Sequence, residues 1–210
     1  MKNIIALMGP SGSGKDFILK LLKHSKGRYE RLIINKVNFI TPATTRPARL
    51  NEIHGDNYYF ITDERFERGI KEGEFAEFQT FNNWHYGVYK NDIKEECWNI
   101  GVFNINAIQL LKINSDYNIY PILCSCSDRA RLIRQLQRED NPDIKEILRR
   151  YEADKKDFLT IPFNYDIINS ENETSIQLLD ESYKKAIYDT IVIINSKIAK
   201  SWTKPCNESL

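Results

Sequence analysis

Cysteine and histidine are scarce in this 210-residue sequence, and neither shows a pattern typical of a metal site. The cysteines form no C-x-x-C pair, and their density is far below that of a small secreted disulfide scaffold. The three histidines show no ligand spacing either. We therefore expect a reducing, cytoplasmic location and no structural metal. The cysteines are Cys97, Cys124, Cys126 and Cys206.

Long apolar runs are also missing. The N-terminal run covers only residues 4–8, whereas a bilayer-spanning helix needs about 20 apolar residues. It leads into a glycine-rich turn and not into a signal-peptide cleavage site. We find no internal repeat and no low-complexity segment. The sequence therefore predicts neither a membrane anchor nor an export signal, and no membrane partner.

Charge of one sign is not in excess. The 30 Lys and Arg residues almost balance the 29 Asp and Glu residues, for a formal net charge of +1. A chain without a global positive field is not expected to bind nucleic acid. The length and the 41% hydrophobic content are enough for one sizeable core, which predicts a single globular domain.

Apolar runs and helical patterns alternate along most of the chain. Residues 3–8 form an apolar run before a glycine-rich turn, and residues 17–22 follow with apolar side chains at helical spacing. Strand, loop and helix in this order open an α/β fold, with a parallel sheet and helices on both of its faces. Further runs typical of buried parallel strands cover residues 31–39, 102–105, 119–124 and 165–168.

Three segments depart from this alternation. Residues 41–88 are rich in aromatic residues and polar turns, with a short helix after Thr62, which indicates an inserted mixed-β subdomain. Residues 128–158 are charged and helical, and the turn residues 140–143 should break them into a helical hairpin that can serve as a lid. Apolar residues at helical spacing from 174 to 198 predict one long helix before a loose tail.

A glycine-rich loop follows the first predicted strand and has the spacing G-x-x-x-x-G-K. Glycines let backbone N–H groups point at phosphate oxygens, the helix that follows adds a favourable dipole, and the lysine supplies a movable charge. ATP or GTP is the ligand that such a loop implies. Its predicted nucleotide-binding residues are Gly9, Ser11, Gly12, Ser13, Gly14 and Lys15.

The residue after the lysine departs from the usual motif. A serine or threonine that touches Mg²⁺ is common at this position, and here it is Asp16. A carboxylate is a hard oxygen ligand that can hold the ion directly or through water, although it adds negative charge beside phosphates. We therefore expect Mg²⁺ to be held mainly by the ATP phosphates, with Asp16 as the protein ligand.

The inserted segment carries several motifs in a fixed order. They are Thr44-Thr45-Arg46-Pro47-Ala48-Arg49, then Gly55-x-x-Tyr58-x-Phe60, Glu74-Phe75-Ala76-Glu77-Phe78 and Tyr86-Gly87. With the glycine-rich loop, this order and spacing resemble the guanylate kinase family over residues 3 to about 190. The resemblance implies one domain over 1–210, with a core (1–40, 89–127 and 159–190), a nucleoside-monophosphate-binding insert (41–88), a lid (128–158) and a C-terminal helix and tail (191–210).

The resemblance also implies an acceptor site. Arg46 and Arg49 offer two planar charged forks to one phosphate dianion, and Tyr58 and Tyr86 offer two phenol donors. The family's base-selecting carboxylate corresponds to Glu77, which would accept hydrogen bonds from the guanine N1–H and exocyclic amine. These five residues, with Asn106, are the predicted substrate-binding residues.

Departures from the family pattern leave the base and sugar preference open. Two hydroxyl positions are Pro42 and Val88 here, and the acidic D-x-D segment is Asn104-Ile105-Asn106. An amide at Asn106 can complement groups that a carboxylate repels, so a modified purine or a 2′-deoxy substrate is an alternative. A binding module that has lost catalysis is a second alternative, although it would usually lack the loop lysine and the clamp arginines.

The predicted lid carries arginines. Arg134 and Arg138 lie one helical turn apart, and Arg149 lies on the other arm of the hairpin. Their spacing resembles that of the family's lid arginines, which neutralise charge on the transferring phosphoryl group. Asn169 ends the last predicted core strand and resembles a position beside the donor adenine.

These observations predict a nucleoside monophosphate kinase that uses ATP and Mg²⁺ to phosphorylate GMP or dGMP. The catalytic residues are expected to be Lys15 with Arg134, Arg138 and Arg149. The expected partners are ATP and a purine nucleoside monophosphate, and the sequence leaves open whether the chain acts alone or as a homodimer.

Overall fold

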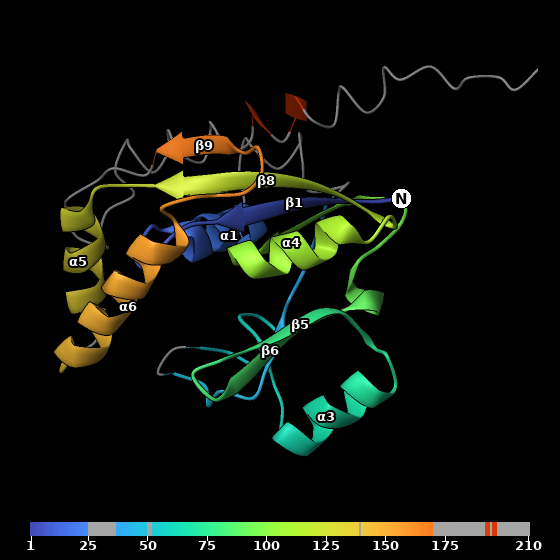
Figure 1. Ribbon diagram of the computed structural model, residues 1–210, viewed down its shortest axis with the longest axis horizontal. Helices are drawn as coiled ribbons and strands as arrows, with labels where there is room; N and C mark the ends of the chain where they lie inside the picture. The colour runs from blue at the N-terminus through green and yellow to red at the C-terminus, as the bar shows by residue number, and fades with distance from the viewer. Residues whose placement is uncertain (25–36, 50–51, 139, 170–191, 194, 197–210) are drawn as a thin grey trace, which may run out of the picture. The chain divides into compact units, whose positions relative to one another are not determined.

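The computed structural model describes residues 1–24, 37–49, 52–138, 140–169, 192–193 and 195–196. Its larger sheet has five strands in the order β2-β7-β1-β8-β9 (Figure 1). Strand β2 pairs with β7, and β8 with β9, both in parallel. The predicted α/β fold with a parallel core sheet is confirmed. The strands are β1 (Lys2–Met8), β2 (Val37–Phe39), β7 (Trp98–Val102), β8 (Tyr117–Ser125) and β9 (Asp166–Asn169).

Strand β1 is the central strand of this sheet. Its residues from Ile4 to Met8 have no exposed surface, which explains why the strand reads as a continuous apolar run and not as an alternating one. The chain divides into two compact units, residues 1–6 with 37–120 and residues 7–36 with 121–210. Each unit carries one group of the predicted site residues.

The first unit contains a second, four-stranded sheet in the order β4-β3-β6-β5. Strands β5 and β6 form an antiparallel hairpin whose two turn residues, Asn82 and Asn83, both have positive φ angles of 50° and 62°. Asparagine tolerates this conformation better than most residues, which suits it to a two-residue hairpin turn. The strands are β3 (Ala43–Thr44), β4 (Tyr59–Phe60), β5 (Phe75–Phe81) and β6 (Trp84–Tyr89).

Helix α3 (Asp63–Lys71) packs against the small sheet and forms a hydrophobic core with it. It begins after Thr62, whose hydroxyl accepts a hydrogen bond from the Arg65 amide at 3.2 Å and caps the helix. The buried Phe66 ring stacks on Phe75 of β5 with 4.5 Å between ring centroids. The short helix predicted after Thr62 is therefore present, and it anchors the sheet that carries the acceptor-site motifs.

The predicted strand at residues 102–105 is wrong. Strand β7 ends at Val102, and helix α4 (Ile105–Ile113) begins three residues later. Asn104 is the N-cap of this helix, because its side-chain oxygen accepts a hydrogen bond from the Ala107 amide at 2.8 Å. A short apolar run does not distinguish a strand from a buried helix turn, and the asparagine cap decides for the helix.

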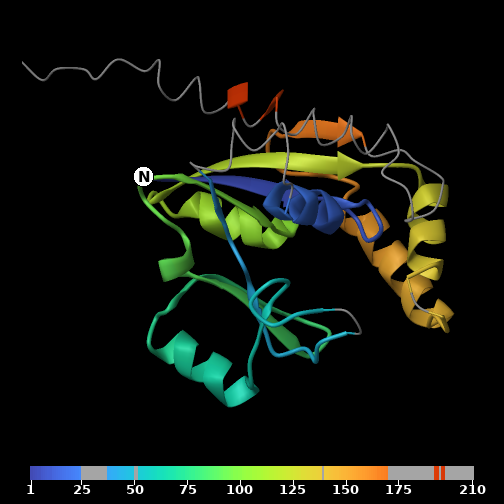
Figure 2. The same ribbon diagram turned by 180° about the vertical axis from the view of Figure 1, so that it is seen from behind.

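The second unit contains helices α1 (Lys15–His24), α5 (Asp128–Leu136) and α6 (Ile144–Asp157). Helices α5 and α6 lie side by side (Figures 1 and 2). Ser127 and Asp143 cap them, because the side chain of each accepts a hydrogen bond from the backbone amide of the third helical residue, Ala130 in α5 and Glu146 in α6. The break predicted at residues 140–143 falls between the two helices.

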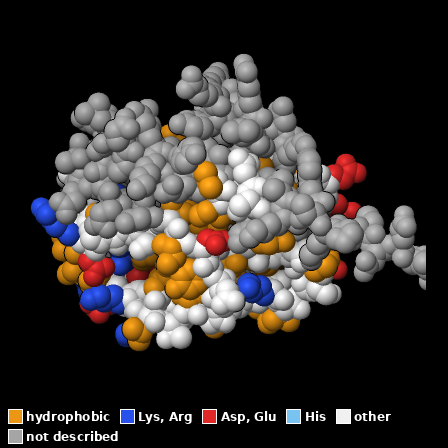
Figure 3. Space-filling view, turned by 90° about the horizontal axis from the view of Figure 1, so that it is seen from above, with side chains coloured by type: hydrophobic (Ala, Val, Ile, Leu, Met, Phe, Trp, Pro, Cys, Tyr) orange, Lys and Arg blue, Asp and Glu red, His pale blue; other side chains and the backbone are white. Residues whose placement is uncertain are grey.

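Some predicted elements lie outside the described residues. They include most of the strand expected at 31–39 and all but four residues of the helix expected from 174 to 198. Of the helices that the structure does describe, none is long and apolar enough to cross a membrane. On the face drawn in Figure 3, the described Lys and Arg side chains form separate spots and not a continuous basic area.

Candidate functional site

The glycine-rich loop of the second unit connects β1 to α1. Gly12 and Gly14 have φ angles of 79° and 89°, a backbone conformation that suits glycine. A Cβ atom added to Gly12 would stand 2.5 Å from the backbone oxygen of Arg131, so this position also requires glycine for close packing. Helix α1 starts at Lys15, which places its N-terminal amides and dipole at the end of the loop. This arrangement can bind an anion such as a phosphate chain.

Lys15 is held at the loop by long polar contacts. Its Nζ atom lies 3.5 Å from the Pro10 oxygen and 3.7 Å from an Asp16 carboxylate oxygen. The Lys15 side chain is 17% exposed, whereas the Asp16 side chain is 72% exposed. The ammonium group is thus free to move toward a phosphate, and the Asp16 carboxylate is open to solvent and to a hydrated cation.

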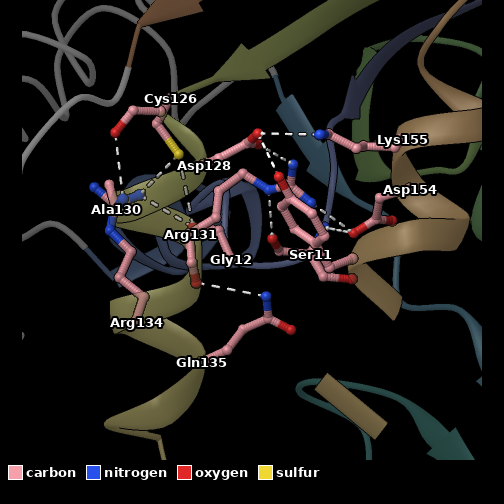
Figure 4. Close-up of polar contacts among 12 residues, drawn as sticks. Ser11, Gly12, Cys126, Asp128, Ala130, Arg131, Arg134, Gln135, Asp154 and Lys155 are labelled. Atoms are coloured by element: carbon pink, nitrogen blue, oxygen red, sulfur yellow. Dashed lines mark hydrogen bonds and ion pairs between the residues drawn. The ribbon is translucent and has the colours of Figure 1, made fainter. Parts of the chain in front are cut away.

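Of the predicted lid arginines, Arg134 contacts the loop. Arg134 on α5 donates from Nη1 to the Gly12 oxygen at 3.1 Å and contacts the Cys126 sulfur at 3.4 Å (Figure 4). Arg138 follows the end of α5 and is exposed. Arg149 on α6 donates to both carboxylate oxygens of Glu146, at 2.6 and 2.9 Å.

Two residues that were not predicted as site residues lie against the loop. The Arg131 side chain is 5% exposed and donates from Nε to the Ser11 oxygen at 3.0 Å. It also donates to Oδ2 of Asp154 at 2.9 Å, and the same oxygen accepts the Ser11 amide at 2.7 Å (Figure 4). Arg131 lies three residues before Arg134, so a helical-face argument could have found it. Asp154 had no such signal.

The first unit brings together the predicted acceptor residues Arg46, Arg49, Tyr58 and Tyr86. The Arg46 guanidinium lies 5.5 Å from the centre of the Tyr58 ring, and Tyr58 meets Tyr86 edge to face at 6.2 Å. Glu52, which the sequence did not single out, joins the two arginines. Its carboxylate accepts Arg46 Nη2 at 2.9 and 3.0 Å and the Arg49 backbone amide at 2.8 Å.

The Arg46–Glu52 ion pair is almost fully buried, with side-chain exposures of 10% and 9%. A buried pair of this kind holds the guanidinium in one orientation, because leaving either charge alone in the interior would be costly. The second edge of a guanidinium can still donate to a phosphate. Arg46 is therefore oriented by the protein before any acceptor binds.

Glu77 lies on β5, next to Val88 of β6 in the hairpin register. It is 6% exposed, and its Oε2 atom has no hydrogen-bond partner among the described residues. Burial raises the pKa of this carboxyl to about 7. A buried carboxylate without a partner is unstable unless a ligand supplies hydrogen-bond donors.

The remaining predicted residues occupy element ends. Asn106 is exposed in the first turn of α4, while Asn104 is engaged as the cap of that helix. Asn169 ends β9, where its backbone is in register with Ser125 of β8. Within the described part of the chain, no group of three or more His, Cys, Asp or Glu side chains is placed to hold a metal ion.

Comparison with known proteins gives a consistent result. A family model described as "Guanylate kinase" matches residues 1–186. A guanylate kinase of Helicobacter pylori (strain HPAG1) is 29% identical, with 99% of this chain and 98% of that protein covered. One from Mycoplasma genitalium is 31% identical over 84% of this chain and 72% of that protein. The crystal structure of guanylate kinase from Anaplasma phagocytophilum has a TM-score of 0.59 at 20% identity, covering 98% and 89% of the two chains.

Proposed function

The chain belongs to the guanylate kinase family, and we propose that it transfers the terminal phosphoryl group of ATP to GMP or dGMP. The observation that carries this proposal is the buried Glu77 carboxyl, whose Oε2 atom has no hydrogen-bond partner in the part of the chain that the structure describes. Glu77 lies two residues along the hairpin register from Tyr86, one of the acceptor residues grouped with Arg46 and Arg49. Guanine presents two adjacent donors, N1–H and the exocyclic amine, that one carboxylate edge can accept. Adenine presents no such pair.

On the donor side, the loop amides hold the ATP phosphates and Lys15 follows their negative charge. The loop residues Gly9, Ser11, Gly12, Ser13 and Gly14 form the backbone of this cradle. The Ser11 amide donates to Asp154, so Ser11 shapes the cradle, and the Gly12 and Gly14 amides are the ones assigned to the phosphates. Arg134 neutralises charge on the transferring phosphoryl group in the transition state, because phosphoryl transfer depends mainly on positioning and electrostatics. Asn169, at the end of β9, is assigned to the edge of the ATP site.

Asp16 is the residue that would hold Mg²⁺, directly or through water. Its carboxylate is a hard oxygen ligand and is largely exposed, which fits an ion whose other ligands are water and phosphate oxygens. When bound, the ion neutralises charge on the phosphates. The Asp16 side chain holds the ion and contributes no proton.

On the acceptor side, Arg46 and Arg49 bind the monophosphate dianion, with Tyr58 and Tyr86 as further donors. Glu52 keeps both arginines in place through the contacts described above. Asn106 is exposed at the start of α4, and we assign it to the base or the sugar. No side-chain nucleophile is needed, because the acceptor phosphate itself attacks.

The proposal includes the cellular setting and the segment roles. The described cysteines Cys97, Cys124 and Cys126 form no disulfide with one another, which fits a cytoplasmic protein. The core, insert and lid are assigned to the segments predicted from the sequence, with α5 and α6 as the lid.

A panel of acceptors tests the proposal. We expect ADP release from ATP and Mg²⁺ with GMP and dGMP, and turnover with AMP, UMP, dTMP and dCMP lower by at least about 10²-fold in kcat/KM, because a site built for two donors rejects bases that lack them. Turnover with another base alone would move the assignment to a kinase of altered base range. A chain that binds GMP without turnover would be a binding module.

The two neighbouring arginines of α6, Arg149 and Arg150, provide a second test. Arg149 was predicted for the lid role, but Arg150 lies one helical turn before Asp154, the residue that touches the loop. Arg149 is roughly 140° around the helix from Asp154. We expect Arg150→Ala to lower kcat by about 10²-fold, the effect of losing one transition-state donor. We expect Arg149→Ala to lower kcat by less than about 20-fold. A larger loss for Arg149→Ala would restore the original assignment.

A further inference from the structure

The phosphate loop is tied to both lid helices through one residue, Ser11. Its carbonyl oxygen accepts a hydrogen bond from Nε of Arg131 on α5, and its amide donates to Oδ2 of Asp154 on α6. The two side chains are themselves an ion pair of 2.9 Å, shared through the same carboxylate oxygen. Figure 4 shows the three groups meeting at the loop. Arg131 is 120 positions from Ser11 in the sequence, and Asp154 is 143 positions from it.

The ion pair is well shielded from water. Arg131 is 5% exposed and Asp154 is 16% exposed. Arg131 also pairs with Asp128 at 2.9 Å and lies 5.3 Å from the centre of the Tyr151 ring. Tyr151 in turn donates to Asp128 at 2.6 Å. A shielded guanidinium with this many partners has one favourable orientation, so it holds the Ser11 carbonyl in one place.

The charges in this network are placed so that they do not repel a polyanion. A lone carboxylate beside the phosphate loop would disfavour ATP, but Arg131 neutralises Asp154 at hydrogen-bond distance. The pair therefore contributes geometry to the loop without contributing net charge. The same helix face that carries Asp154 also carries Arg150, one turn earlier.

We propose that Arg131 and Asp154 are a positioning pair that shapes the phosphate loop for ATP and ties the arginine-bearing helix α6 to the loop. The inference rests on the proposed function for its link to catalysis. Neither residue needs to touch ATP, because both act through the backbone of Ser11.

Matched variants test this pair by ATP binding in the absence of any acceptor, measured by calorimetry on the full chain. In Asp154→Asn one amide oxygen can accept both hydrogen bonds that Oδ2 now accepts, whereas Asp154→Ala loses both. We expect Asp154→Ala and Arg131→Ala to weaken ATP binding about tenfold, the size of one charged hydrogen bond, and Asp154→Asn to stay within about threefold. Asp128→Ala removes a different partner of Arg131, one that does not touch the loop, and we expect it to stay within about twofold.

Steady-state kinetics separate positioning from general loss of structure. We expect the KM for ATP to rise about tenfold in Asp154→Ala while the KM for GMP changes less than about twofold, because the acceptor residues belong to the other compact unit. Equal ATP affinity in Asp154→Ala and wild type would overturn the inference. So would an Asp154→Asn variant as weak as Asp154→Ala, since the hydrogen bonds would then not matter.

Hydrogen exchange on the wild-type protein keeps the inference testable if the alanine variants do not fold. We expect the Ser11 backbone amide, which donates to Asp154, to be protected without ATP, and rapid exchange at that amide would overturn the inference. If wild type bound ATP but did not phosphorylate GMP, the proposed function would fail while the binding comparison of the Asp154 variants would still decide the role of the pair.

Discussion

Replacement of Lys15 by methionine is expected to lower kcat/KM for ATP by about 10³-fold, the effect of removing a charge that acts in a water-excluded transition state. Methionine keeps an unbranched side chain of similar length and removes only the ammonium group. The contacts of Lys15 in the structure are long, 3.5 Å to Pro10 and 3.7 Å to Asp16. Its charge therefore contributes little to the folded state and is available to the phosphates.

The same measurement on Lys20→Met provides the control. Lys20 is exposed on α1, one turn beyond the loop, and we expect its variant to keep wild-type kinetics. Thermal unfolding should give similar midpoints for both variants. If Lys15→Met kept more than about a tenth of the wild-type kcat/KM, the loop lysine would not be the phosphate-binding charge that the motif implies.

Glu77→Gln is expected to make the unliganded protein more stable at pH 8 and to destroy its base preference. Burial raises the folded-state pKa of Glu77 from 4.5 to about 7. A raised carboxyl pKa contributes stability below the unfolded value, and that contribution is lost as pH rises from about 4.5 to about 7. A glutamine has no such loss, so the variant should gain up to about 3 kcal/mol over wild type at pH 8 and little at pH 4.5.

Glu77→Gln is expected to impair recognition of GMP although it stabilises the unliganded protein. A glutamine offers one acceptor where guanine needs two, so the kcat/KM preference for GMP over AMP should fall by about 10²-fold or more. In wild type, the KM for GMP should rise as pH falls below about 7, because the free enzyme then holds Glu77 protonated. In the variant this rise should disappear.

Urea unfolding at the two pH values and acceptor kinetics from pH 6 to 8.5 check these expectations. Glu67→Gln, an exposed change on α3, serves as the matched control and should alter neither the stability difference nor the pH profile. A Glu77→Gln variant with unchanged stability at pH 8, or with an intact preference for GMP, would contradict the assigned role of the carboxyl.

Features that depend on residues close together in the sequence could be predicted well. The loop could be predicted because its glycines determine a backbone conformation within a few residues, and Gly12 and Gly14 have the positive φ angles that such a loop requires. The two lid helices could be predicted because Pro142 and its polar neighbours cannot continue a helix. The strand at residues 102–105 was misplaced because an apolar run of that length fits a strand and a helix turn equally well.

The sequence by itself determined the fold class, the phosphate loop and the presence of Arg46, Arg49 and Glu77 in their motifs, because these depend on residue type and short spacing. Only the tertiary structure decided that Glu52 pairs with Arg46, that Glu77 is buried with its pKa raised to about 7, and that Arg131 and Asp154 both bond to Ser11. Residues distant in sequence determine which side chains are buried and which partners they meet. The residue type alone therefore does not indicate whether a carboxyl group will be desolvated on folding.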